Sequence, residues 1–255
     1  MNRIIKFVLI DIMRNKIIIA YAVLLALLSW SVFNMEDSSN KGLLTLLNVI
    51  LLVVPLVSVL FSTIYIYNSS EFIELMLSQP VKRTQIWVSL FAGLSLSFIV
   101  AYLLAAGIPL LLFARFTQAI LLLVTGCILS VIFVAIAFLS AILSRDKAKG
   151  IGIAILIWLY FALLFDGLVL FLLFQFSDYP IEKPMVLLSA TSPVDLARIL
   201  NLLQIDASAM MGYTGAIFKD YFGTGPGMIV SFTVLCMWAV LPFYFSLRIF
   251  RKKDL

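Results

Sequence analysis

The sequence contains no histidine and few charged residues, and both shortages narrow the possible functions. Of its 255 residues, 12% are charged and 64% are hydrophobic. Because histidine is absent, catalysis by an imidazole and histidine ligation of a metal are excluded. Soluble domains average about 25% charged and about 45–50% apolar residues, so this composition is typical of a membrane protein.

Cysteine is also scarce, and the two cysteines, Cys127 and Cys236, both fall within apolar runs. Two cysteines so placed indicate neither a disulfide framework nor a zinc site. Together with Met237, Met210 and Met211 they are the soft groups that Cu(I) prefers as ligands, although they follow no recognisable ligand spacing. Cysteine and methionine are also ordinary apolar residues. We therefore predict no metal site and keep a copper path along these side chains as the weaker alternative.

An ATP-binding motif is missing as well. The phosphate-binding loop of many ATPases reads G-x-x-x-x-G-K-[ST], and no such run occurs here. No nucleophile stands beside a plausible base either. We predict that the chain is not an enzyme and binds no cofactor, so that any ATP and Mg²⁺ would belong to a separate subunit.

Long apolar runs dominate what is present. A helix needs about 20 apolar residues to cross a bilayer. Six runs approach or exceed this length: 17–33, 43–67, 86–113, 119–143, 151–176 and 228–250. Without a visible internal repeat, they predict an all-α polytopic membrane protein with one transmembrane domain over residues 1–255.

The positive charge is distributed unevenly between the two sides of the predicted membrane. The N-terminus, residues 68–85, residues 144–150 and the C-terminal tail hold 13 of the 18 Lys and Arg residues. Cytoplasmic loops are enriched in these residues, so both termini are predicted to be cytoplasmic, in a bacterial cytoplasmic membrane. The net charge of +5 therefore reflects topology and indicates no nucleic-acid partner.

Before the first run, residues 1–16 combine basic and apolar residues. This pattern favours an amphipathic helix lying along the inner membrane surface. The alternative is a ragged extension of the first span.

The cytoplasmic loop 68–85 contains a short helix, predicted over about residues 70–78. Asn68, Ser69 or Ser70 would cap it, and Pro80 would end it. Glu71 and Glu74 suit its first turns, where the helix dipole favours negative charge. Phe72, Leu75 and Met76 form an apolar patch on it. An apolar patch facing the cytosol favours a docking site for a partner over a simple connector.

The outer segment 177–227 is unusually polar for this chain. Ser192 and Pro193 suit the start of a helix, and Asp195 suits its first turn. An apolar stripe follows at helical spacing, formed by Leu196, Ile199, Leu200 and Leu203, with Asp195, Arg198 and Asn201 on other faces. A second helical stretch is predicted over 207–218. Two amphipathic pieces between spans indicate an interfacial or re-entrant hairpin, or else a cap that only shields the spans.

Asp166 lies in the middle of the fifth run. A carboxylate inside a membrane costs about 2.5–3.5 kcal/mol on insertion scales, so it is a candidate for translocation. It would bind a cation, relay a proton, or pair with a hydroxyl or backbone group across a dimer.

The loop sequence EFIELMLSQPVKR resembles the coupling helix of ABC-2 type permeases, which are similar to type V exporters. The resemblance implies that Glu71, Glu74, Pro80 and Arg83 belong to an element that docks on an ATPase subunit. Six spans, cytoplasmic termini, an amphipathic N-terminus and a long outer segment also agree with that family.

The outer sequence SPVDLARILNLLQIDASAMMGYTGA is similar to NosY-like permeases, which act in nitrous oxide reductase maturation. The resemblance implies an outer gate or partner-docking surface made of these residues: Pro193, Asp195, Arg198, Asp206, Met210, Met211, Gly212, Thr214 and Gly215. It also implies a homodimer in the membrane lipid, two copies of a NosF-like ATPase, a periplasmic NosD-like assembly protein and a copper- or sulfur-related cargo.

Three alternatives remain at this point. The first is an ABC-2 exporter of another cargo, such as a drug, lipid or peptide. The second is an ion-coupled secondary transporter that uses Asp166 and works without an ATPase. The third is a passive membrane anchor for a partner enzyme.

Overall fold

The computed structural model describes residues 2–36, 38–175, 188–205 and 225–252. Over these residues the chain is helical, and six of its helices are long and apolar enough to cross a membrane. They are α2 (Lys16–Met35), α3 (Ser39–Asn68), α5 (Arg83–Phe113), α6 (Phe116–Leu143), a fifth helix that begins at Lys147, and α12 (Gly225–Lys252). The predicted fold class with six spans is thereby confirmed.

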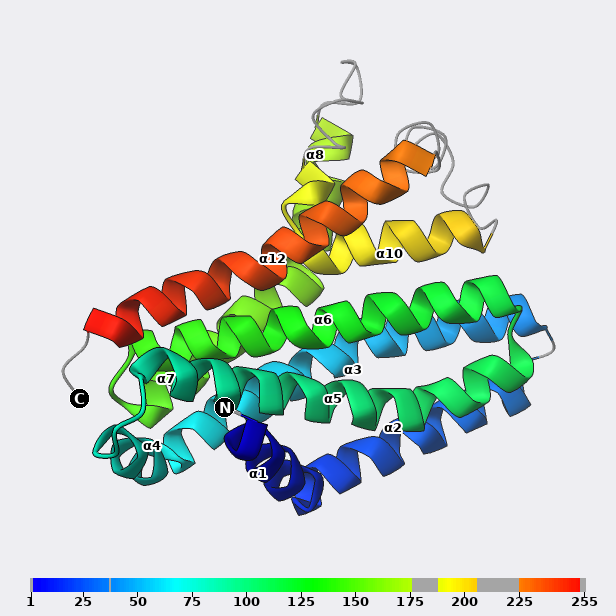
Figure 1. The fold of residues 1–255 in the computed structure, drawn as a ribbon. Coiled ribbons are helices and arrows are strands. Elements are labelled where there is room, and N and C mark those ends of the chain that lie inside the picture. Colours follow the sequence, from blue (N-terminus) through cyan, green and yellow to red (C-terminus); the bar gives the residue numbers. More distant parts are fainter. Residues whose placement is uncertain (1, 37, 176–187, 206–224, 253–255) are drawn as a thin grey trace.

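Helix α6 lies at the centre of the bundle. It packs against α3, α5 and α12, and α2 joins the bundle through α5 and α3 (Figure 1). Helix α6 is apolar all round, so it can pack against other helices on most of its surface and face lipid elsewhere. Its long buried side chains, such as Phe133 and Phe138, interdigitate with those of its neighbours.

The fifth span is interrupted, whereas the sequence predicted one continuous run. It consists of α7 (Lys147–Leu159), a π-helical turn (η1, Tyr160–Leu164) and α8 (Phe165–Gln175). A π-turn inserts an extra residue into the helix and redirects the segment that follows. Beyond this turn, α8 diverges from α6, and the outer half of α12 diverges with it (Figure 1). The turn therefore sets the position of Asp166, the second residue of α8.

Helix α1 (Asn2–Met13) is separate from α2, as predicted, and is not an extension of it. The break follows from Asn15, whose Oδ1 accepts a hydrogen bond of 2.9 Å from the amide of Ile17 and caps α2. Val8 and Ile12 of α1 are fully buried. Gly93 of α5 allows this close approach, since a Cβ there would lie 2.6 Å from Val8 Cγ1.

Two short helices lie toward opposite ends of the bundle. The first is α4 (Ser70–Leu77), near the N-terminus and the last residues of α12, and we call this the α4 end (Figure 1). The second is α10 (Pro193–Gln204), which runs beside α6 toward the opposite end, called the α10 end. These two helices hold several of the candidate residues that the sequence singled out, and Asp166 lies on α8.

Candidate functional site

Helix α4 is present where the loop pattern predicted it, although its start differs from the expected capping. Ser69 is the N-cap residue, but its hydroxyl accepts no capping hydrogen bond. The Asn68 side chain accepts instead from Lys147 Nζ at 2.8 Å. Pro80 lies beyond the helix and Arg83 is the first residue of α5, so neither is part of α4 itself.

The predicted apolar patch of α4 is divided between two environments. Leu75 is 66% exposed, whereas Phe72 and Met76 are half-buried. Phe72 stacks on Phe7 of α1 with ring centroids 5.6 Å apart. Ile73, which the sequence analysis did not select, is the one buried residue of α4, at 5% exposure. Ile73 is followed by apolar residues three and four positions later, Met76 and Leu77. This helical spacing in the sequence would have predicted that Ile73 is buried.

These contacts leave α4 attached to the bundle mainly through one face. Ile73 and its half-buried neighbours hold that face, while Glu71, Glu74 and Leu75 are exposed. An exposed leucine on the same helix as two exposed carboxylates offers both an apolar contact and charge to a partner. The arrangement is therefore suited to docking, in the manner predicted for a coupling helix.

Helix α10 begins as the sequence predicted. Ser192 Oγ accepts a hydrogen bond of 3.2 Å from the amide of Asp195, and Pro193 occupies the first turn. At the other end, the amide of Ile205 donates to the carbonyl of Asn201 at 3.1 Å. The helix boundaries thus follow from local chemistry.

The surroundings of α10 differ from the prediction of a single apolar stripe. It is enclosed by α6, α3, α12 and η1, and both its apolar and its polar faces are covered. Its buried residues are Pro193, Val194, Leu196, Ala197, Ile199, Leu200 and Asn201. Burial of α10 against the spans fits a re-entrant hairpin and equally a cap that shields the spans.

Asn201 shows why the polar face can be buried. It is only 2% exposed, and its Nδ2 donates to Thr125 Oγ1 of α6 at 2.9 Å. Gln118 Nε2 of α6 donates to the carbonyl of Gln204 at 3.2 Å. A buried polar group is tolerated when it is hydrogen-bonded, so α6 supplies the partners that let α10 enter the bundle.

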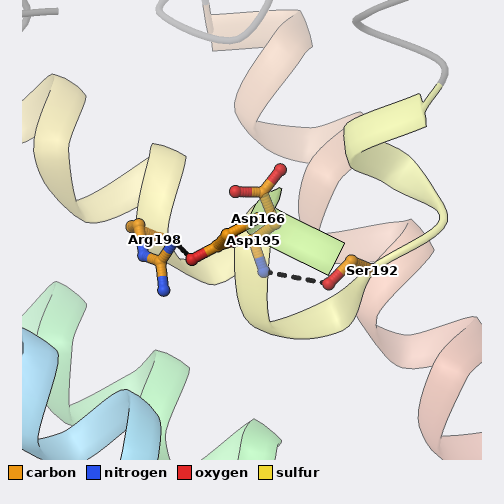
Figure 2. Close-up of polar contacts among 4 residues, drawn as sticks. All are labelled: Asp166, Ser192, Asp195 and Arg198. Carbon is orange, nitrogen blue, oxygen red and sulfur yellow. Dashed lines mark hydrogen bonds and ion pairs between the residues drawn. The ribbon is translucent and has the colours of Figure 1, made fainter. Parts of the chain in front are cut away.

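Asp166 and Arg198 form an ion pair that joins α8 to α10 (Figure 2). The two side chains are 31% and 24% exposed. The sequence analysis left three roles open for Asp166: binding a cation, relaying a proton, or pairing with a hydroxyl or backbone group across a dimer. In the structure its side chain makes an ion pair within the chain. Its partner is a guanidinium 32 residues along the same chain, because the divergent α8 passes close to α10. The pairing offsets the cost of holding the carboxylate among apolar helices.

A second carboxylate, Asp195, lies one helical turn from Arg198 (Figure 2). Burial raises the pKa of Asp195 to about 6, although the positive charge of Arg198 acts in the opposite direction. The nearby Asp166 carboxylate raises the pKa further. The Asp166–Arg198–Asp195 cluster therefore holds two acidic groups around one fixed positive charge.

Two known proteins are similar to this chain over most of its length. A probable ABC transporter permease protein NosY from Pseudomonas aeruginosa is 28% identical over 231 residues, which cover 80% of this chain and 82% of that protein. Another probable NosY, from Stutzerimonas stutzeri, is 25% identical over 222 residues, covering 78% and 79%. Over about four-fifths of its length the chain is therefore similar to permeases named NosY. No protein-family model matches it.

This similarity confirms the resemblance to NosY-like permeases that the sequence predicted. Its relatives are named as permeases of ABC transporters, which supports a multi-pass membrane subunit that is distinct from the ATPase.

Several of the predicted residues lie outside the described part of the structure. They are the helical stretch 207–218 and, in or next to it, Asp206, Met210, Met211, Gly212, Thr214 and Gly215. The soft groups that are described lie on two helices: Cys127 on α6, half-buried, and Cys236 and Met237 on α12, both exposed. Within the described ranges, no group of three His, Cys, Asp or Glu residues is placed to hold a metal ion.

Proposed function

We propose that this chain is the membrane-spanning subunit of a homodimeric ABC transporter of the NosY type. It resides in a bacterial cytoplasmic membrane with both termini in the cytoplasm, and two copies of a separate ATPase bind ATP and Mg²⁺. The observation that carries the proposal is the similarity to permeases named NosY over about four-fifths of the chain. The six apolar helices and the exposed α4 support it.

In this proposal, α4 is the element that receives the movement of the ATPase. Its exposed residues Glu71, Glu74 and Leu75 dock on that subunit, and its buried face, centred on Ile73, passes the movement to α3 and α5. An exposed leucine at the centre of a contact loses water on binding and contributes affinity. The ATPase cycle then rocks the spans against each other.

At the other end, α10 and the Asp166–Arg198 pair form the outer gate. The cargo is a copper- or sulfur-related species used to assemble the copper site of nitrous oxide reductase, and a periplasmic NosD-like protein receives it. The support is the resemblance of the α10 sequence to the outer segment of NosY-like permeases. The ion pair gives the gate two states, because separating α8 from α10 breaks it.

Copurification tests the proposal. The chain is expressed with the ATPase and periplasmic proteins encoded beside it and is isolated in mild detergent. We expect a complex that contains two copies of the chain and hydrolyses ATP. The variant Leu75→Glu should reduce the yield of this complex and its rate of ATP hydrolysis at least tenfold. Met35→Glu is the matched control, since Met35 is also exposed, at 81%, but lies at the end of α2 away from α4.

A chain that purifies alone, with no ATPase bound, would contradict the proposal. Assembly that survives Leu75→Glu would contradict the role of α4. A complex that forms but does not respond to the periplasmic assembly protein would instead favour an ABC exporter with another cargo.

A further inference from the structure

A cavity of about 420 Å³ lies at the α4 end, between the ends of several helices. It is lined by residues of α3, α4, α5, α6, α12 and the connection after α6, among them Glu74, Trp87, Ala141, Ser144, Arg145 and Phe250. The cavity is partly open at the surface of the protein. Ligand pockets typically have volumes of about 300–1,000 Å³, so this cavity has room for an occupant.

The inner wall of the cavity is apolar and fixed. Trp87 and Phe250 stack with ring centroids 4.2 Å apart, and they are 2% and 1% exposed. Trp87 Nε1 donates to Ser246 Oγ at 3.0 Å, and Ser246 Oγ donates to the carbonyl of Phe138 at 3.0 Å. Because the indole N–H has a partner, this wall presents only ring surface to an occupant. It suits an apolar group, above all an aromatic one.

Two opposite charges stand among the lining residues. Glu74 lies on α4, and Arg145 lies just beyond the end of α6. Both side chains are exposed, and neither makes an ion pair or hydrogen bond with any residue that the structure describes. The occupant that matches this cavity therefore combines a large apolar group with a cation on one side and an anion on the other.

We propose that this cavity is a socket for one large apolar side chain of the ATPase subunit. A basic residue of the same ATPase segment would pair with Glu74, and an acidic one with Arg145. The inference rests on the proposed function, because it needs an ATPase docked at α4. It adds a second contact, in which the ATPase inserts a side chain into the permease behind α4.

The geometry favours a side chain over the acyl chain of a lipid. The lining carries both an acidic and a basic side chain, Glu74 and Arg145, which an acyl chain cannot pair with. The charged groups lie on α4 and on the connection after α6, which are outside the spans. A side chain seated here touches α5 and α12 directly, so the ATPase would move these helices as well as α4.

Filling the cavity tests the socket in the intact complex. Ala141 lines the cavity and is 6% exposed, so Ala141→Trp places an indole in the space. Leu143→Trp is the matched control, because Leu143 is on the same turn of α6 but is 60% exposed and does not line the cavity. We expect ATPase association at least tenfold weaker for Ala141→Trp and unchanged for Leu143→Trp, with each variant first checked for monodisperse elution on its own.

Photocrosslinking provides a second measurement if Ala141→Trp fails to fold. A benzoylphenylalanine in place of Ser144, which lines the cavity, should crosslink to an ATPase peptide with a large apolar residue between a basic and an acidic one. The same group in place of Leu143 should not. A crosslink to phospholipid, or none in an assembled complex, would overturn the socket and, in the first case, assign the cavity to lipid.

The two proposals fail in different ways. If Leu75→Glu disrupts the complex while Ala141→Trp leaves it intact, docking at α4 stands and the socket is wrong. If the wild-type chain binds no ATPase at all, the proposed function itself is wrong.

Discussion

Helices α4 and α10 are both short and amphipathic, but they are packed in opposite ways at the two ends of the bundle (Figure 1). Helix α10 buries seven residues, whereas α4 buries one, Ile73. The difference lies in what each polar face meets. Thr125 and Asp166 offer partners to Asn201 and Arg198 of α10, while the polar face of α4 meets an open cavity and solvent.

The comparison shows that an amphipathic pattern does not by itself determine how deeply a helix is buried. A polar face is buried where neighbouring helices satisfy its hydrogen bonds and charges, and it stays free where they do not. By this criterion α10 is part of the folded core, and α4 is available to a partner. Four measurements test this contrast.

The largest expected difference is between one leucine on each helix. Leu196 of α10 is fully buried, so Leu196→Ala should lower the free energy of unfolding by about 2–5 kcal/mol through lost packing. Leu75 of α4 is 66% exposed, so Leu75→Ala should change it by no more than about 0.5 kcal/mol. Thermal unfolding of both variants in one detergent measures the difference, and equal shifts would contradict the contrast.

The ion pair at the α10 end gives the second effect. Arg198→Leu leaves the Asp166 carboxylate without its partner. Loss of one partner of a fully buried pair costs about 3–5 kcal/mol, and since both groups here are partly exposed we expect about 2 kcal/mol.

A double variant provides the control for this ion pair. Asp166→Leu combined with Arg198→Leu removes both charges and should recover most of the loss in unfolding temperature. If the double variant is less stable than Arg198→Leu alone, then the Asp166 carboxylate stabilises the fold by a contact other than its ion pair with Arg198.

Alanine substitution of two glycines tests how much space the α10 end and the α4 end leave for an added methyl group. A Cβ at Gly126 of α6 would lie 2.3 Å from Tyr102 Oη, and Tyr102 is fully buried. A Cβ at Gly150 of α7 would lie 2.0 Å from Tyr67 Oη, but Tyr67 lines the cavity. We expect Gly126→Ala to cost about 1–3 kcal/mol by overpacking.

Gly150→Ala should cost less, because Tyr67 has the cavity to move into. Unfolding temperatures of the two alanine variants give the comparison. A larger loss for Gly150→Ala would mean that the hydrogen bonds from Tyr67 Oη to the carbonyls of Ala141 and Ser144 matter more than the room to move.

The smallest expected effect is a pH dependence of the free energy of unfolding, caused by Asp195. Its pKa is raised to about 6 in the folded chain, above its usual value of 3.8. The folded state therefore binds a proton more readily than the unfolded state, and the stability this gives is lost as the pH rises through about 6. We expect the chain to be about 1 kcal/mol more stable at pH 5 than at pH 7.

Asp195→Asn should remove this gain in unfolding temperature at pH 5, whereas Leu75→Ala at the α4 end should retain it. A profile that is unchanged in Asp195→Asn would assign the pH dependence to another group.

Much of the fold was predictable because its signals are local. The length of an apolar run determines whether a helix crosses a bilayer, so six spans follow from the order of the residues. The start of α10 also follows from adjacent residues, since Ser192, Pro193 and Asp195 form the cap together. The resemblance of the α4 and α10 segments to NosY-like permeases was likewise readable, and the comparisons support it.

The tertiary structure alone decided how these helices meet. The π-turn at Tyr160–Leu164 directs α8 toward α10, and only this brings Asp166 to Arg198. Burial of Asn201 depends on Thr125, which is 76 residues away in the chain. The cavity behind α4 is formed by the ends of five helices, so no single segment encodes it. Helix formation depends on neighbours in sequence, whereas burial, ion pairing and cavities depend on neighbours in space.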